Sequence, residues 1–291
     1  MGESVAPSSA SLGAPASVRG QRIELGVLRN GLGSIRNLEL LLKSIKVGQK
    51  GLFAAVAAVH ADCGPMIAIA LGLAQALVES GVEGGCAERL SSALATSLTD
   101  LDGMLATAVE AGRLSVAQRL KLERDLARCA RELGSTLPLV ALIERASRPR
   151  PLELTPADLV HASSAERAEQ KSVSVVRAFS PDAEHVGLNV DLEAAKMLVA
   201  VGVALVMEGQ PDAQPQLSFD VQAGGAPVTT VALGPLPGGD AAQGQQARVR
   251  IVALRISAPS AMCAEVAARS LGGRFEYDRD AHRVCIYWPL S

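Results

Sequence analysis

The sequence feature that most constrains the fold is a long apolar run between Leu52 and Leu77, whose hydrophobic residues recur every three or four positions. This spacing is typical of a helix, because a helix has 3.6 residues per turn. At about 100° per residue, His60 falls roughly 80° from the centre of the apolar seam, at the border between the packed face and water. We therefore predict a long helix with one titratable side chain at its edge. The seam consists of Leu52, Val56, Val59, Cys63, Met66, Ala70, Ala74 and Leu77.

A second apolar run follows a glycine-rich break at residues 81–85. Its residues from Leu90 to Leu114 again have helical spacing, so the two runs predict an antiparallel hairpin with its tip at the glycines. Upstream, the same spacing begins at Ile35, and we expect that helix to run into the His60 segment. A single hairpin leaves its seam exposed, so we expect a homodimer in which two hairpins close a four-helix bundle.

The helical pattern continues from Ser115 to Ala146, which is longer than a hairpin requires. Two arrangements are open. This segment either lengthens the stalk against residues 35–55 or folds as an extra helix. Pro149 and Pro151 end it.

Charge and cysteine content exclude several classes of protein. A net charge of −2 and a sequence pI near 6.1 give no electrostatic basis for binding nucleic acid or an anionic membrane. The five cysteines are scattered and odd in number, which argues against a disulfide framework and against a zinc site. His60 and Asp62 interrupt the longest apolar stretch, and the N-terminus has no signal-peptide pattern. We expect a cytoplasmic protein that spans no membrane.

The pattern changes after Arg150, where short strands alternate with helices. This order predicts an α+β sandwich behind the helical region. We divide the chain into a disordered segment rich in Ser, Ala, Pro and Gly (1–32), a helical domain (33–148) and an α/β domain (149–291). Expected strands cover 152–154, 172–179, 185–190, 217–222, 228–233, 248–256, 274–277 and 283–288, and expected helices cover 155–171, 191–207 and 261–271.

The order of residues after His60 resembles the phosphoacceptor box of the histidine kinase dimerisation and phosphotransfer (DHp) domain. That box reads His, acid, aliphatic, Arg or Asn, Thr or Asn, Pro, Leu. His60 and Pro65 match it, as does the hydrophobic run that follows. Ala61 stands where the family has an acid that acts as a base during phosphorylation by ATP. Gly64 stands where the family has the Thr or Asn that orients a water for dephosphorylation.

The C-terminal residues 270–277 and 284–290 resemble the last turn and hairpin of the histidine kinase ATP-binding domain, which has a GHKL or Bergerat-like fold. The resemblance covers roughly residues 50–290 as an ordered pair of domains. It also implies an asparagine on helix 191–207 to hold magnesium, but that helix is aliphatic and lacks one. The implied Asp-x-Gly-x-Gly loop is missing as well, since Asp240 is not followed by Gly-x-Gly. We therefore expect a degenerate domain that binds no ATP.

The leading hypothesis is a histidine phosphotransferase that relays phosphoryl groups through His60 to or from a response-regulator receiver. Ala61, Cys63, Gly64 and Pro65 would support the histidine or leave room for the receiver. The protein itself would need no cofactor, since the receiver brings the Mg²⁺, and an upstream histidine kinase is a further expected partner. The alternative is an inactive pseudokinase scaffold that binds a receiver or a kinase. A divergent autokinase is a third reading, and it requires binding of magnesium-ATP. His161, His185 and His282 have no partner at a catalytic spacing and are expected to be ordinary surface residues.

Overall fold

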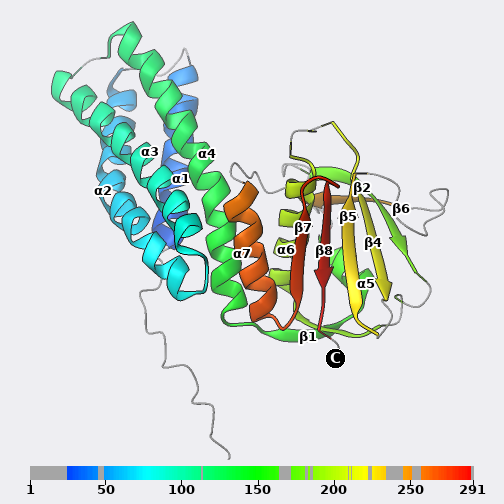
Figure 1. Ribbon diagram of the computed structural model, residues 1–291. Helices are drawn as coiled ribbons and strands as arrows, with labels where there is room; N and C mark the ends of the chain where they lie inside the picture. The colour runs from blue at the N-terminus through cyan, green and yellow to red at the C-terminus, as the bar shows by residue number, and fades with distance from the viewer. Residues whose placement is uncertain are drawn as a thin grey trace, which may run out of the picture.

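The computed structural model describes residues 25–44, 49–112, 114–163, 172–180, 186–208, 212–221, 225–233, 245–250 and 257–289, together with Ala183 and Gln210. Its N-terminal part consists of four long helices that stand side by side, at the left of Figure 1. They are α1 (Leu25–Lys43), α2 (Gln49–Glu79), α3 (Gly84–Ala111) and α4 (Val116–Ala146).

One chain closes the four-helix bundle. Helix α1 packs against α2 and α4, and α3 packs against the same two helices, so each helix buries its apolar seam on two neighbours. The approach of α1 to α2 is close, because a Cβ at Gly31 would overlap the side chain of Met66. The expectation that two hairpins from two chains form the bundle is therefore corrected.

Two breaks in the helical pattern separate these helices. Helix α1 ends at Lys43 and α2 begins at Gln49, so the predicted continuous helix from Ile35 into the His60 segment is wrong. Helix α3 ends at Ala111, and its C-cap Gly112 has the left-handed φ of 61° that favours glycine. Ser115 then starts α4 with a capping box, in which its side chain and that of Gln118 each bond the other's backbone N–H. The segment 115–146 thus folds as an extra helix.

The first helix begins earlier than the sequence pattern indicated. Residues 25–32 are the first turns of α1, with Leu28 fully buried, although they were expected to belong to a disordered segment. Residues 1–24 lie outside the described part of the chain. By length and composition alone, α2 could cross a membrane.

The C-terminal part is an α+β unit built on a mixed six-stranded sheet in the order β6-β2-β4-β5-β8-β7. Only β2 and β4 pair in parallel among the described strands, and the remaining neighbours are antiparallel. The strands are β2 (Ser172–Phe179), β4 (Gln216–Val221), β5 (Pro227–Ala232), β6 (Gln245–Arg250), β7 (Arg274–Asp278) and β8 (Arg283–Tyr287). A separate two-stranded sheet joins β1 (Pro151–Leu154) to β3 (Leu188–Asp191).

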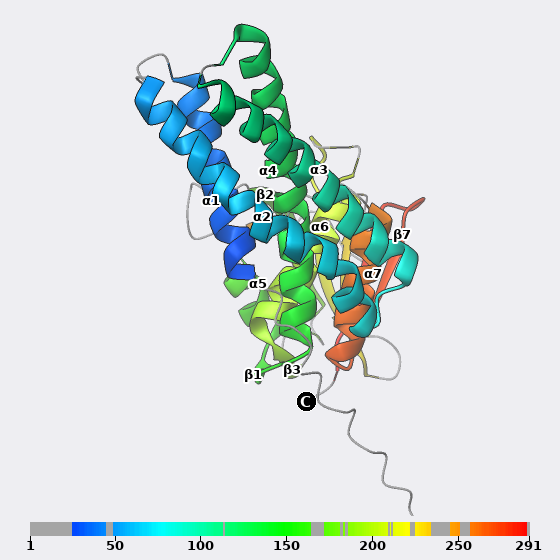
Figure 2. The same ribbon diagram turned by 90° about the vertical axis from the view of Figure 1, so that its left-hand side faces the viewer.

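Three helices accompany this sheet: α5 (Pro156–Ser163), α6 (Leu192–Val206) and α7 (Ser257–Ser270). Helix α7 lies between the bundle and the sheet, since it packs on α3 and α4 on one side and on α6 and β7 on the other. Helix α6 packs on α4, α7 and strands β5 and β8. Seen from the side of the bundle, the sheet lies behind the long helices (Figure 2). One continuous apolar core therefore joins the two parts.

The predicted strands and helices of this unit agree with the structure to within a few residues at most ends. Part of the expected helix 155–171 and of the expected strand 248–256 lies outside the described residues, as does the loop that contains Asp240.

Candidate functional site

His60 lies on α2 at the edge of the packed face, as its angle from the apolar seam predicted. Its side chain is 37% exposed, and its Nδ1 atom lies 2.7 Å from Oδ1 of Asp102 on α3. The Asp102 side chain is 33% exposed, so the pair lies at the surface of the bundle and not in its core. The two residues are 42 positions apart in the sequence.

The antiparallel register of α2 and α3 brings the pair together. Gly81 is in the turn between the helices, with a φ of 95°, and Asp102 lies as far after it as His60 lies before it. Closer to the turn, the Ser91 hydroxyl donates to the carbonyl of Ala70 at 2.6 Å, which agrees with this register to within one residue. The hairpin geometry therefore determines which α3 residue faces His60.

Three residues that follow His60 on α2 have small or uncharged side chains. Ala61, Gly64 and Pro65 are all exposed, and a Cβ at Gly64 would meet no atom within 4 Å. Pro65 has no N–H, so the carbonyl of Ala61 one turn earlier has no helical hydrogen bond to accept. A partner can therefore approach the imidazole without displacing a side chain from these positions.

Cys63 faces the interior. Its side chain is fully buried, and burial, followed by the nearby Asp102 and Asp62 carboxylates, raises the pKa of its thiol to about 12. A thiol with so high a pKa is not a nucleophile at neutral pH. Cys63 therefore supports the His60 segment from inside the bundle and offers no docking surface.

This burial predicts a clear order of thiol reactivity. Cys129 and Cys263 are also fully buried, with thiol pKa values raised to about 12 mainly by burial, whereas Cys285 is only half-buried. Treatment of the native protein with iodoacetamide at pH 8 should therefore label Cys285 first. Labelling of the four buried thiols, which are these three and Cys86, should require unfolding in urea, as mass spectrometry of digests would show. Rapid native labelling of Cys63 would contradict the packing described above.

Sequence reasoning missed Asp102 and considered Asp62, the nearest acid along the chain. Asp62 is half-buried, and the structure gives it no hydrogen bond to His60. The signal that identifies Asp102 is its distance from the hairpin tip. Positions at equal distances on either side of the turn face each other in an antiparallel helix pair.

Of the remaining histidines, only the side chain of His282 belongs to the described part of the chain. It lies in the turn between β7 and β8 with a φ of 45°. His185 and the side chain of His161 lie outside the described residues.

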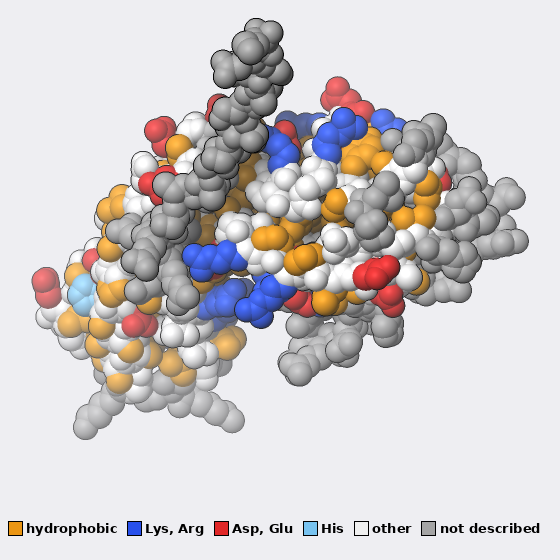
Figure 3. Space-filling model, turned by 90° about the horizontal axis from the view of Figure 1, so that it is seen from below, with side chains coloured by type: hydrophobic (Ala, Val, Ile, Leu, Met, Phe, Trp, Pro, Cys, Tyr) orange, Lys and Arg blue, Asp and Glu red, His pale blue; other side chains and the backbone are white. Residues whose placement is uncertain are grey.

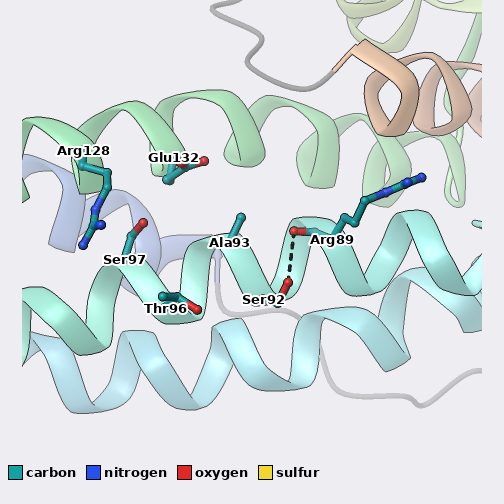
Figure 4. A pocket seen from close by; sticks show the side chains of 7 residues that line it. All are labelled: Arg89, Ser92, Ala93, Thr96, Ser97, Arg128 and Glu132. Atoms are coloured by element: carbon teal, nitrogen blue, oxygen red, sulfur yellow. Dashed lines mark hydrogen bonds between the residues drawn. The ribbon is translucent and has the colours of Figure 1, made fainter.

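A shallow groove lies between α3 and α4 (Figure 4). Arg128 at one end donates to Asp100 at 2.6 Å and lies 3.7 Å from Asp125, so its charge is already balanced. His60 and Asp102 do not line this groove, and it therefore belongs to no site that includes them. Its lining residues are Arg89, Ser92, Ala93, Thr96, Ser97, Arg128 and Glu132.

The described residues contain no cluster of three or more His, Cys, Asp or Glu side chains that could hold a metal ion. Helix α6, where the family would have a magnesium-binding asparagine, is almost entirely buried, and Gly202 in it would bring a Cβ to 3.2 Å from Val284. Its charged residues Glu193 and Lys196 pair with each other at 3.1 Å. Helix α6 thus lacks the asparagine amide that the resemblance implied for holding magnesium.

No protein-family model matches the chain, and no curated protein sequence matches it. The solved structures that match include two histidine kinases. The Acinetobacter baumannii histidine kinase AdeS matches with 10% identity and a TM-score of 0.34, over 67% of this chain and 95% of that one. The Erythrobacter litoralis EL346 blue-light activated histidine kinase matches with 16% identity and a TM-score of 0.23, over 69% of this chain and 60% of that one. Similarities of this size establish neither family nor activity.

Proposed function

We propose that this protein accepts and passes phosphoryl groups through Nε2 of His60. The observation that carries the proposal is the exposure and the hydrogen bonding of the imidazole. It is partly exposed, its Nδ1 is bonded to Asp102, and no hydrogen bond to Nε2 occurs among the described residues. The open surface at Ala61 and Gly64 suits a macromolecular partner better than a small substrate, which would need an enclosing cleft.

The donor or acceptor is the aspartate of a response-regulator receiver. In the forward step, neutral Nε2 attacks the phosphorus of an aspartyl phosphate, the N–P bond forms, and the O–P bond breaks to release the receiver's carboxylate. The receiver would bring its own Mg²⁺. The bundle contributes a fixed imidazole at an accessible surface, and position and orientation supply much of the rate of such transfers.

The proposed reaction uses no ATP. Helix α6 has no asparagine to hold magnesium, and its aliphatic side chains are buried against α4, α7 and the sheet. The α/β unit therefore serves as a structural support for α4 or as an additional contact for a partner. The phosphoryl groups come from a receiver, which an upstream histidine kinase would charge. Receivers work in the cytoplasm, and we place this protein there too, which suits its free cysteines.

The test is transfer of label from charged receivers. A panel of receiver domains is charged with a small-molecule phosphodonor and mixed one by one with the purified protein. Acid-labile label located on His60 by mass spectrometry supports the proposal and identifies the partner. Label on any other residue, or none with any receiver, refutes it.

A docking variant tests the same surface without touching the imidazole. Replacing Gly64 with Arg places a long charged side chain one turn from His60, in space that is empty. The fold should be unaffected, since a glycine inside a helix costs about 1 kcal/mol relative to better helix formers. We expect transfer from the receiver to fall at least tenfold, roughly the effect of 1.4 kcal/mol of lost binding. Gly103→Arg on α3 is a second variant at an open position, and Gly112→Asn, far from His60, is the control.

A second candidate function is a pseudokinase scaffold, and one observation favours it. The phosphoacceptor box of histidine kinases also fits α1 at four places, Leu28, Arg29, Asn30 and Leu32, but Gly26 stands where the family has histidine. Helix α1 packs on α4, and α4 leads directly into the α/β unit. On this reading α1 and α4 are the ancestral hairpin, and α2 and α3 occupy the place of a partner's hairpin. The protein would then bind a receiver or kinase without transferring phosphate.

A further inference from the structure

We infer that Asp102 is the positioning residue of the His60 site: its carboxylate holds the imidazole in the tautomer that leaves Nε2 free to attack phosphorus. The inference rests on the proposed function of His60. It concerns a residue on a different helix from the histidine. The observation behind it is the 2.7 Å contact between Nδ1 of His60 and Oδ1 of Asp102.

The direction of this hydrogen bond follows from the chemistry of the two groups. An ionised carboxylate can only accept, so Nδ1 must carry the hydrogen. In a neutral imidazole the other nitrogen then carries the lone pair, and that nitrogen is Nε2. Without a partner at Nδ1, the ring would exchange between tautomers and would rotate about its side-chain bonds.

No other described carboxylate can take this role. Ala61 has replaced the acid that follows the histidine in the histidine kinase pattern, and Asp62, the next residue, makes no hydrogen bond to the ring. Asp102 is fixed by the pairing of α2 and α3, which buries Leu101 and Leu105 on either side of it. The hairpin therefore supplies from α3 the carboxylate that α2 lacks next to its histidine.

The negative charge of the Asp102 carboxylate is also opposite in sign to the charge that develops on the imidazole during transfer. When Nε2 forms its bond to phosphorus, it uses its lone pair, and the Nδ1 hydrogen stays on the ring, so the imidazole becomes a cation. The electrons of the broken O–P bond leave with the receiver's carboxylate. The negative charge of Asp102 at 2.7 Å stabilises the ring cation, and reversal of the step returns the neutral imidazole.

The experiment combines a spectroscopic readout with transfer kinetics on the full chain. The imidazole ¹⁵N shifts of His60 are measured by NMR in wild type, in Asp102→Asn and in the control Asp62→Asn, and the rate of label transfer is measured in the same three proteins. We expect wild type and Asp62→Asn to show the Nδ1–H tautomer and equal rates. Asp102→Asn should shift the ring toward the Nε2–H tautomer. Its transfer should be about 10- to 100-fold slower, the range found when the outer hydrogen-bond partner of a metal-binding histidine is removed.

The outcomes separate this inference from the proposed function. An Nε2–H tautomer in wild type, or equal transfer by wild type and Asp102→Asn, overturns the role of Asp102 and leaves His60 as the phosphoacceptor. An Nδ1–H tautomer together with no label on wild type refutes the proposed function, and Asp102 then only orients a surface ring. If Asp62→Asn slows transfer as much as Asp102→Asn, the inference also fails. The slower transfer would then come from the loss of any negative charge near His60 and not from the hydrogen bond to Nδ1.

Discussion

Replacing Asp191 with alanine is expected to lower the free energy of unfolding by about 3 kcal/mol, as removal of one partner of a buried ion pair does. Asp191 lies between β3 and α6, and its side chain is fully buried. Arg145 near the end of α4 bonds both of its oxygens, with distances of 2.9 Å from Nε to Oδ1 and 2.8 Å from Nη2 to Oδ2. This bidentate pair ties the bundle to the α/β unit.

Two backbone groups depend on the same carboxylate. Arg150 N–H donates to Oδ2 at 2.7 Å, and Ala194 N–H donates to Oδ1 at 3.0 Å, which makes Asp191 the N-cap of α6. Loss of an N-cap alone costs about 1 kcal/mol. The Arg145 side chain is about a third exposed and can take up water when its partner is lost, which is why we expect a value at the lower end of the range for buried pairs.

Seen from below, Lys and Arg side chains gather at the surface where the bundle and the α/β unit meet (Figure 3).

Urea unfolding followed by circular dichroism measures this effect. The matched control is Glu193→Gln, which lies two residues away and pairs with Lys196 at the surface. Its charge acts on Arg145 without an ion pair, and its loss should change stability by less than about 0.5 kcal/mol. Equal effects of the two substitutions would show that the Arg145 pair does not join the two parts of the molecule.

The same carboxylate predicts how stability depends on pH. Burial by itself would raise the pKa of Asp191, but the bonds from Arg145, Arg150 and Ala194 and the charge of Arg145 outweigh it and hold the pKa below its ordinary value. Because the folded pKa is the lower one, the contribution of Asp191 is fully present above the unfolded pKa of about 3.9. It is lost as the pH falls from there through the folded pKa. Asp191→Asn should therefore lose less stability than wild type between pH 5 and about pH 3, by urea midpoints at each pH.

The α/β unit could be predicted from sequence because each of its elements has a local signal. Thr155 and Asp158, for example, form a cap at the start of α5, and the alternation of apolar residues identifies β4 and β8. The bundle was harder, because the helical period is the same in one long helix and in two helices joined by a turn. The break before α4 was readable from Gly112 and the Ser115 capping box, but the pairing of α1 with α4 depends on tertiary contacts.

Of the two residues of the candidate site, one could be predicted from the local sequence and the other could not. His60 could be found from its place beside the apolar seam, since that depends only on helical angles. Asp102 could not be found by proximity in the sequence, where Asp62 is nearer. It required the register of the hairpin, which is set at Gly81 and seen again in the bond from Ser91 to Ala70. Pairing across a predicted turn is therefore the step that sequence reasoning about this site omitted.

Replacing His60 with glutamine is expected to abolish acid-labile labelling of the protein by every charged receiver. The amide of glutamine can still donate a hydrogen bond to Asp102, and its size is close to that of imidazole, so the bundle should remain folded. It has no nitrogen lone pair that can attack phosphorus, and the loss should therefore be complete and not partial. Filter-bound label before and after acid treatment, together with mass spectrometry of the digest, measures the result.

The matched control is His282→Asn, which removes an imidazole from the turn between β7 and β8. Asparagine tolerates the left-handed φ of 45° at that position, so this variant should fold and should label as wild type does. A wild type that binds a receiver without being labelled, and a His60→Gln variant that binds it equally well, would favour the scaffold. In that case the glycine at position 26 of α1 marks the lost phosphoacceptor, and His60 is a surface residue of the hairpin that completes the bundle. Labelling that disappears with His60 alone instead assigns the transfer to α2, where Asp102 supplies the carboxylate from across the turn.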